Sequence, residues 1–137
     1  MSTEQTITTN TNQYARIQID TILNKKGNDF NLVDNCVVIN KNNIKVKVTA
    51  KVTINRSNET SDRLFGLLIE KNSYALTYQT LKNLSAKANY QEITCEAIID
   101  VNKNDKIYLD LRSVAAENVS AVCNAGRCIT SLIVEEL

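Results

Sequence analysis

The stretch NNIKVKVTAKVTINR, residues 42–56, decides the fold class of this 137-residue chain. Every second residue from Ile44 to Ile54 is apolar, and the residues between them are lysines or threonines. A period of two is that of a β-strand, whose successive side chains point to opposite faces. The stretch therefore predicts a long strand with one face against a core and the other face basic and hydroxyl-bearing.

Similar alternation recurs along the chain between polar turns, which indicates further strands. We expect them at 14–23, 30–39 (as two short pieces), 63–70, 74–80, 89–101, 106–112 and 127–137. We treat 81–88 as a loop, and 114–122 as a short helix or a loop. About eight strands in one chain of this length predict an all-β domain: an antiparallel two-sheet jelly-roll sandwich over residues 14–137, preceded by a polar N-terminal arm, residues 1–13.

The composition excludes several classes of protein. The formal net charge is only +1, whereas proteins that bind nucleic acid or membrane surfaces carry a basic excess. No apolar run approaches the ~18 residues of a membrane span, and the start MSTEQTITTNTN lacks the features of a signal peptide. There is no His and there are only three Gly, so the commonest general base and Gly-rich phosphate loops are missing. We expect a non-enzymatic protein without cofactor or metal, which binds neither nucleic acid nor membranes.

Three stretches together resemble a known superfamily: VVINKNNIKVKVTAKVTI (37–54), LLIEKNSYALTY (67–78) and IIDVNKNDKIYLDL (98–111). They resemble the strand–turn–strand, hairpin and turn–strand segments of the trimeric jelly-roll domain of the tumour necrosis factor and complement globular-head superfamily. The resemblance implies that the inner sheets of three subunits pack around a threefold axis, with the strands at 44–54 and 89–101 as neighbours in that sheet.

The resemblance also implies which residues would meet sister subunits. Lysines of the strand at 44–54 would lie beside glutamates of the strand at 89–101, because opposite charges on adjacent strands attract. The predicted trimer-interface residues are Lys45, Lys47, Thr49, Lys51, Glu92, Thr94, Glu96, Leu132 and Val134. The alternative is that this polar face is simply solvated, as the outer faces of antiparallel sheets commonly are.

Domains of this kind without a collagen stalk or signal peptide occur in virions of tailed bacteriophages. The resemblance therefore implies a homotrimeric capsid-decoration or head-fibre protein, made in the host cytoplasm and found in the virion. Its partners would be itself and the major capsid protein or another virion protein. The arm would attach it to the particle through Thr6, Ile7, Thr8 and Tyr14. One alternative is a tail-tip module that binds a receptor or a host surface glycan, and another is a cytoplasmic bacterial accessory protein.

Other candidate sites leave alternatives open. We expect the four cysteines to be unligated thiols, but the spacing of Cys123 and Cys128 leaves a disulfide or a zinc pair as alternatives. Carboxylates at 100, 105 and 110 suggest calcium, although lysines interrupt them. Tyrosines at 74, 78, 90 and 108 could stack on sugars, whereas strand tyrosines are more often half-buried.

Overall fold

The computed structural model describes residues 5–9, 14–17, 29–34, 36–55, 62–72, 76–85, 91–113, 117–122 and 131–137. All regular structure in these ranges is β, and none of it is a helix that could cross a membrane. The strands are β1 (Gln5–Thr9), β2 (Tyr14–Arg16), β3 (Phe30–Val33), β4 (Cys36–Ile39), β5 (Ile44–Asn55), β6 (Arg63–Lys71), β7 (Leu76–Leu84), β8 (Gln91–Val101), β9 (Lys106–Ser113), β10 (Glu117–Val122) and β11 (Ser131–Glu136).

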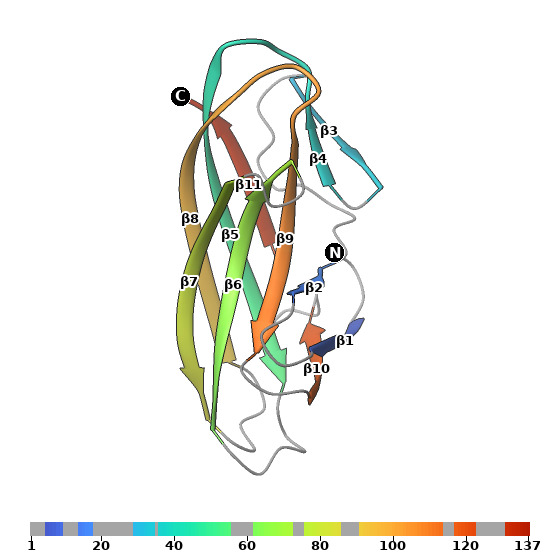
Figure 1. The fold of residues 1–137 in the computed structure, drawn as a ribbon, viewed down its shortest axis with the longest axis vertical. Coiled ribbons are helices and arrows are strands. Elements are labelled where there is room, and N and C mark those ends of the chain that lie inside the picture. Colours follow the sequence, from blue (N-terminus) through green and yellow to red (C-terminus); the bar gives the residue numbers. More distant parts are fainter. Residues whose placement is uncertain are drawn as a thin grey trace.

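The strands form two antiparallel sheets that face each other (Figure 1). In sheet A, β8 pairs with one edge of β5, while β11 and β10 pair with successive parts of the other edge, and β1 pairs with β10. In sheet B the order is β3-β4-β9-β6-β7, and the short β2 shares an edge of β9 with β4. The predicted all-β, two-sheet jelly-roll sandwich is confirmed.

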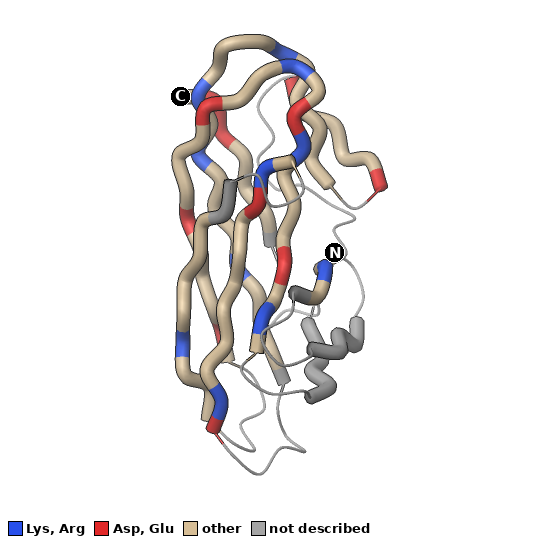
Figure 2. The backbone as a smooth tube through the Cα atoms, in the orientation of Figure 1, with Lys and Arg blue, Asp and Glu red and all other residues tan. Residues whose placement is uncertain are grey.

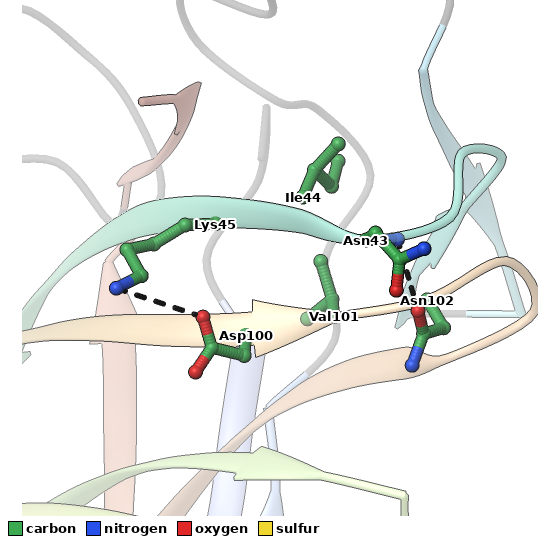
Figure 3. Close-up of a pocket in the computed structure, with 6 residues that line it drawn as sticks. All are labelled: Asn43, Ile44, Lys45, Asp100, Val101 and Asn102. Carbon is green, nitrogen blue, oxygen red and sulfur yellow. Dashed lines mark hydrogen bonds and ion pairs between the residues drawn. The ribbon is translucent and has the colours of Figure 1, made fainter.

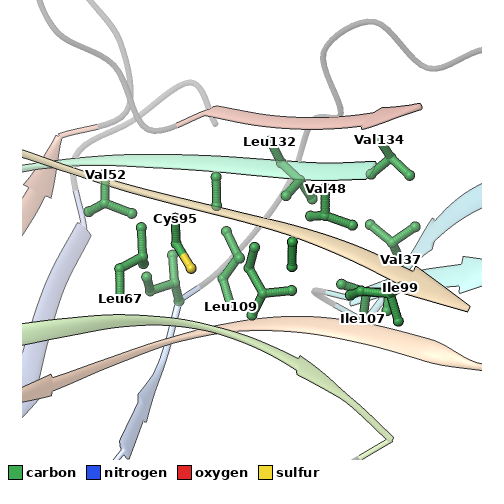
Figure 4. Packing of buried hydrophobic residues seen from close by; sticks show 14 of the residues in the cluster. Val37, Val48, Val52, Leu67, Cys95, Ile99, Ile107, Leu109, Leu132 and Val134 are labelled. Carbon is green, nitrogen blue, oxygen red and sulfur yellow. The ribbon is translucent and has the colours of Figure 1, made fainter. Parts of the chain in front are cut away.

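The core lies between the two sheets, as Figure 4 shows. The apolar residues of the opening stretch supply its sheet A side, and all six from Ile44 to Ile54 are buried. On the sheet B side, strands that include β6, β9 and β4 supply the core residues. Because each buried aliphatic side chain contributes roughly 1.5–3 kcal/mol, this layer holds the domain together. Its labelled members in the figure are Val37, Val48, Val52, Leu67, Cys95, Ile99, Ile107, Leu109, Leu132 and Val134.

Asparagines make several of the tight turns in place of glycine. Asn43, Asn72 and Asn104 have φ values of 53°, 52° and 73°, in the left-handed region. Asn tolerates this conformation better than most residues because its short side chain bonds to nearby backbone. Asn72 follows β6 directly, so the hairpin expected between 63–70 and 74–80 is the β6–β7 pair.

Two expectations about secondary structure were wrong. Residues 81–84, treated as a loop, continue β7, because the start of β6 supplies their backbone partners from Arg63 to Gly66. Residues 117–122, expected as helix or loop, form β10, which pairs with β1 on one side and with the end of β5 on the other. Of the strand expected at 14–23, Tyr14–Arg16 is strand and Ile17 follows it, while 18–23 lie outside the described residues.

The predicted N-terminal arm takes part in the domain itself. Gln5–Thr9, which includes the predicted anchoring residues Thr6, Ile7 and Thr8, pairs as β1 with β10 of the same chain. Tyr14 begins β2 and lies opposite Arg112 of β9. The arm therefore has a backbone partner in sheet A, and Tyr14, the first residue of the predicted domain, has one in sheet B. Attachment of the arm to a particle stays a prediction.

Candidate functional site

The solvent side of sheet A carries the polar residues of the opening stretch. We call it the lysine face and define it by Lys45, Lys47, Thr49 and Lys51 of β5, Glu92, Thr94, Glu96, Ile98 and Asp100 of β8, and Ile133 and Glu135 of β11. Pairing in register brings these alternate residues to one side, while their neighbours enter the core. Figure 2 shows that positive and negative residues are interspersed along the strands.

Acids of β8 neutralise the lysines of β5 within the same chain. Lys47 Nζ lies 3.2 Å from Glu96 Oε1, and Lys51 Nζ lies 3.3 Å from Glu92 Oε2. These are the two glutamates expected beside the lysines. A third pair, Lys45 with Asp100 at 3.7 Å, was not anticipated. Each exposed pair contributes at most about 1 kcal/mol, so the pairs balance charge more than they stabilise the fold.

The last strand contributes different residues to this face from those expected. Leu132 and Val134 lie opposite Ala50 and Val48 and are fully buried in the core. The prediction that these two belong to the trimer interface was wrong, because β11 pairs in the register that turns them inward. Ile133, opposite Thr49, is the apolar residue that β11 presents on the lysine face.

Ile98 is the most notable exposed residue of the lysine face. It lies opposite Lys47 on β8, and 54% of its surface is exposed to solvent. Sequence reasoning missed it because only charged and hydroxyl residues of this strand were taken as interface candidates, although the alternation through Ala97 and Ile99 places residue 98 on this face. Ile98 and Ile133 flank the lysines on either side and add apolar surface to a face on which each lysine is paired with an acid.

A hollow of about 340 Å³ lies where the β5–β8 pair ends, lined by Asn43, Ile44, Lys45, Asp100, Val101 and Asn102 (Figure 3). The backbone N–H of Asn43 donates a 2.9 Å hydrogen bond to Oδ1 of Asn102, and this bond joins the two turns. One ammonium, one carboxylate and two carboxamides thus border the hollow, and groups of this kind hydrogen-bond hydroxyl-rich ligands.

The carboxylates considered for calcium do not come together. Asp100 pairs with Lys45, while Asp110 is buried against Arg16. Asp105 accepts hydrogen bonds from Asn72 Nδ2 and from the backbone of Asn102. Burial pushes the pKa of Asp105 up, but these two bonds and the Lys71 ammonium outweigh burial and hold this pKa below its usual value. Asp105 therefore serves as a link between turns, and no metal-ligating cluster occurs in the described ranges.

A buried charge cluster lies on the outer side of sheet B, away from the core. Glu70 of β6 and Asp110 of β9 are both fully buried. Nε of Arg16, from β2, donates a 2.6 Å hydrogen bond to Oδ1 of Asp110. The Arg16 guanidinium also lies 3.9 Å from the ring centroid of Tyr108. Sequence reasoning missed this cluster because its members are far apart in the chain and carry no common motif.

Glu70 holds a proton that an ordinary glutamate would lose. Burial raises the pKa of Glu70 to about 9, and a hydrogen bond to Asp110 and the negative charge of Asp110 act in the same direction, against the opposing charge of Arg16. Two carboxylates cannot donate to each other, and as carboxylates both oxygens of Glu70 lack a donor in the described structure. A proton on Glu70 makes it the donor to Asp110.

Of the cysteines and tyrosines that the sequence suggested as sites, some lie in or near the core and others lie outside the described residues. Cys36 and Cys95 are free thiols buried in the core region, where a thiol behaves as a small apolar group. Cys123 and Cys128 lie outside the described residues, as do Tyr74 and Tyr90. Tyr78 packs against the core, whereas position 108 is on the opposite side of sheet B, so these two do not form one stacking surface.

No protein-family model matches the sequence, and no curated protein matches it either. Among solved structures, murine APRIL crystallised at pH 5.0 is similar, with a TM-score of 0.55 and 8% identity. The match covers 86% of this chain and 97% of that chain. At such low identity the likeness concerns the fold alone. The chain therefore has a jelly-roll fold similar to that of a tumour necrosis factor family protein.

Proposed function

We propose that this chain is a non-enzymatic structural protein that assembles as a homotrimer through the lysine face and serves in a bacteriophage virion as a capsid-decoration or head-fibre protein. The observation that carries the proposal is the exposed Ile98 on a face whose three lysines are already paired with acids of the same chain. Lysines paired in this way can be covered by a sister subunit at a smaller desolvation cost than isolated lysines. The virion role is supported by the resemblance of the three sequence stretches to jelly-roll domains that occur in phage virions.

Replacing Ile98 with arginine should break the assembly without unfolding the subunit. An added charge at the apolar point of an interface typically raises the dissociation constant at least tenfold, while an exposed substitution changes folding stability by only about 0.5 kcal/mol. Size-exclusion chromatography with light scattering at micromolar concentration should show a trimer for the wild type and smaller species for Ile98→Arg.

Leu81→Arg is the matched control. Leu81 is 48% exposed and lies opposite Gly66 on the outer side of sheet B, far from the lysine face in the sandwich. This variant should remain trimeric. A wild type that is monomeric at these concentrations, or an Ile98→Arg variant that assembles like the wild type, would contradict the proposed interface. Mass spectrometry of purified particles of the encoding phage tests the virion role.

A second candidate function is a tail-tip module that binds a host surface glycan, and the hollow beside Asp100 favours it. If this is correct, glycan arrays should show binding that Asp100→Ala abolishes and that Glu92→Ala, on the same face but outside the hollow, leaves intact. The decoration role instead predicts no glycan signal for either variant or for the wild type.

A further inference from the structure

We propose that Arg16, Asp110 and Glu70, on the outer face of sheet B, form a proton-dependent latch that holds β2, and with it the N-terminal part of the chain, against the edge of β9. The three side chains come from β2, β9 and β6, so the cluster joins the first strand of sheet B to the centre of that sheet. The inference concerns sheet B, and it stands whether or not the lysine face mediates assembly.

The charges around Glu70 leave room for only one negative group. On β9 the neutral Tyr108 lies opposite Glu70, and Asp110 and the exposed Lys106 lie at the two diagonal positions of the same face. Arg112 follows Asp110 on this face, opposite Gly66, and from β2 the cation is Arg16. From β7 the residue opposite Glu70 is an uncharged threonine. β8 and β5 approach β6 from the core side, and their charged residues lie on the lysine face. Arg16 compensates Asp110 at 2.6 Å, and among the described residues Arg16 is the cation whose charge opposes the raised pKa of Glu70. An ionised Glu70 would therefore be a second buried anion that shares this one cation.

β2 is the strand that moves when this anion forms, because it is held less firmly than β6. β6 and β9 pair over seven residues, from Phe65–Lys71 on one strand to Ile107–Ser113 on the other. β2 pairs with β9 over three residues only, extended by one hydrogen bond from the Ile17 N–H to the Leu109 carbonyl, 2.9 Å long. Of the two strands that bring cluster residues to β9, β2 has fewer bonds to lose than β6, so water can reach the carboxylates at the smaller cost if β2 moves away.

The direction of the pH effect follows from proton binding. In the closed form Glu70 keeps its proton up to a pKa of about 9, whereas in an opened form it returns toward its ordinary value of 4.5. The closed form therefore binds one more proton between these values, and the opening equilibrium rises with pH by up to tenfold per pH unit in this window. The latch is closed in acid and loosens progressively toward pH 9.

Opening would also separate the two ends of the N-terminal segment. β1 belongs to sheet A through β10, while β2 belongs to sheet B, so the chain passes from one sheet to the other between Thr9 and Tyr14. If β2 leaves β9, the chain before it is no longer attached to sheet B. Ile17, which is fully buried, also becomes exposed to solvent. The latch thus controls how tightly the start of the chain is attached to the sandwich.

Limited proteolysis with trypsin tests the latch, because trypsin cleaves after Arg16 and needs that segment to be extended and free. The rate of cleavage between Arg16 and Ile17 is measured by mass spectrometry from pH 6.5 to 8.5 and divided by the rate for a free peptide of residues 11–22. This ratio should rise severalfold to tenfold per pH unit in the wild type. Cleavage after Lys51, in the centre of β5, should stay much slower and serves as the monitor of global unfolding.

Glu70→Gln is the decisive variant, since its amide can donate to Asp110 at every pH and cannot ionise. Its ratio should be flat with pH, while Glu96→Gln, which removes an exposed carboxylate from the lysine face, should keep the slope of the wild type. A wild-type ratio that changes less than twofold, or a Glu70→Gln ratio that rises as steeply as the wild type, would overturn the latch. Glu70→Gln can be used only if it has the β-sheet circular dichroism of the wild type. If it does not, the Glu70 carboxyl of the wild-type protein is titrated directly by ¹³C NMR. A pKa near the ordinary value of a glutamate would then overturn the proposal.

Discussion

Replacing Val48 with lysine should leave the chain largely unfolded at 25 °C. Val48 is fully buried in the middle of β5, between Ala97 of β8 and Val134 of β11. An ammonium placed there would be enclosed by aliphatic groups, at a cost of several kcal/mol. Natural domains have only about 5–15 kcal/mol of unfolding free energy, and the lost valine packing adds to the deficit. Far-UV circular dichroism and urea titration measure the effect.

The matched control lies one residue away. Lys47→Val exchanges the same two residue types on the opposite face, and it removes only the exposed pair with Glu96. Its free energy of unfolding should stay within about 1 kcal/mol of the wild-type value. If Val48→Lys unfolds at the same urea concentration as the wild type, or if Lys47→Val is the more damaging change, then the assignment of the two faces of β5 is wrong.

The second large effect is a fall in stability as the pH rises from about 5 to 9. Glu70 has a folded pKa of about 9 against an ordinary value of 4.5, so the folded state binds the extra proton in this window. The stabilisation is fully present below pH ~4.5 and is lost toward pH 9, with a slope of at most about 1.4 kcal/mol per pH unit. Urea unfolding followed by tyrosine fluorescence at pH 5, 6, 7 and 8 gives this slope directly.

Glu70→Gln should remove most of this dependence, and it should be the more stable protein at pH 8. Glu96→Gln is the control, because that carboxyl is exposed and pairs at the surface with Lys47. Parallel stability curves for the wild type and Glu70→Gln would show that Glu70 does not hold a proton at neutral pH. That outcome would also remove the basis of the latch.

The lysine face and the latch lie on opposite outer surfaces of the sandwich. The lysine face belongs to sheet A, whereas Arg16, Glu70 and Asp110 belong to the outer side of sheet B. In an assembly through the lysine face, sister subunits would therefore not contact the latch. A change of pH would then alter the attachment of the N-terminal segment without altering the interface. Measuring the oligomeric state of Glu70→Gln separates the two, because the variant should assemble like the wild type.

Part of the site could be predicted from local pattern and part could not. Lys47, Lys51, Glu92 and Glu96 were expected on one face because a period of two is a local property of the strand. The orientation of β11 could not be predicted in this way, and Leu132 and Val134 were placed on the wrong face. SLIVEE has apolar residues in succession, so its alternation does not say which of them turn inward, and a slip of one residue exchanges the two faces.

The sequence alone determined the all-β class, the two faces of β5 and β8, and the polar turns between strands, since each depends on neighbours within a few residues. The tertiary structure decided the strand order, the inward orientation of Leu132 and the meeting of Arg16 with Asp110, which are 94 positions apart. It also decided the protonation of Glu70, because a pKa depends on which charges the fold brings near and how much water it excludes. Local periodicity reports which way a side chain points along its own strand, but only the pairing of distant strands determines what that side chain meets.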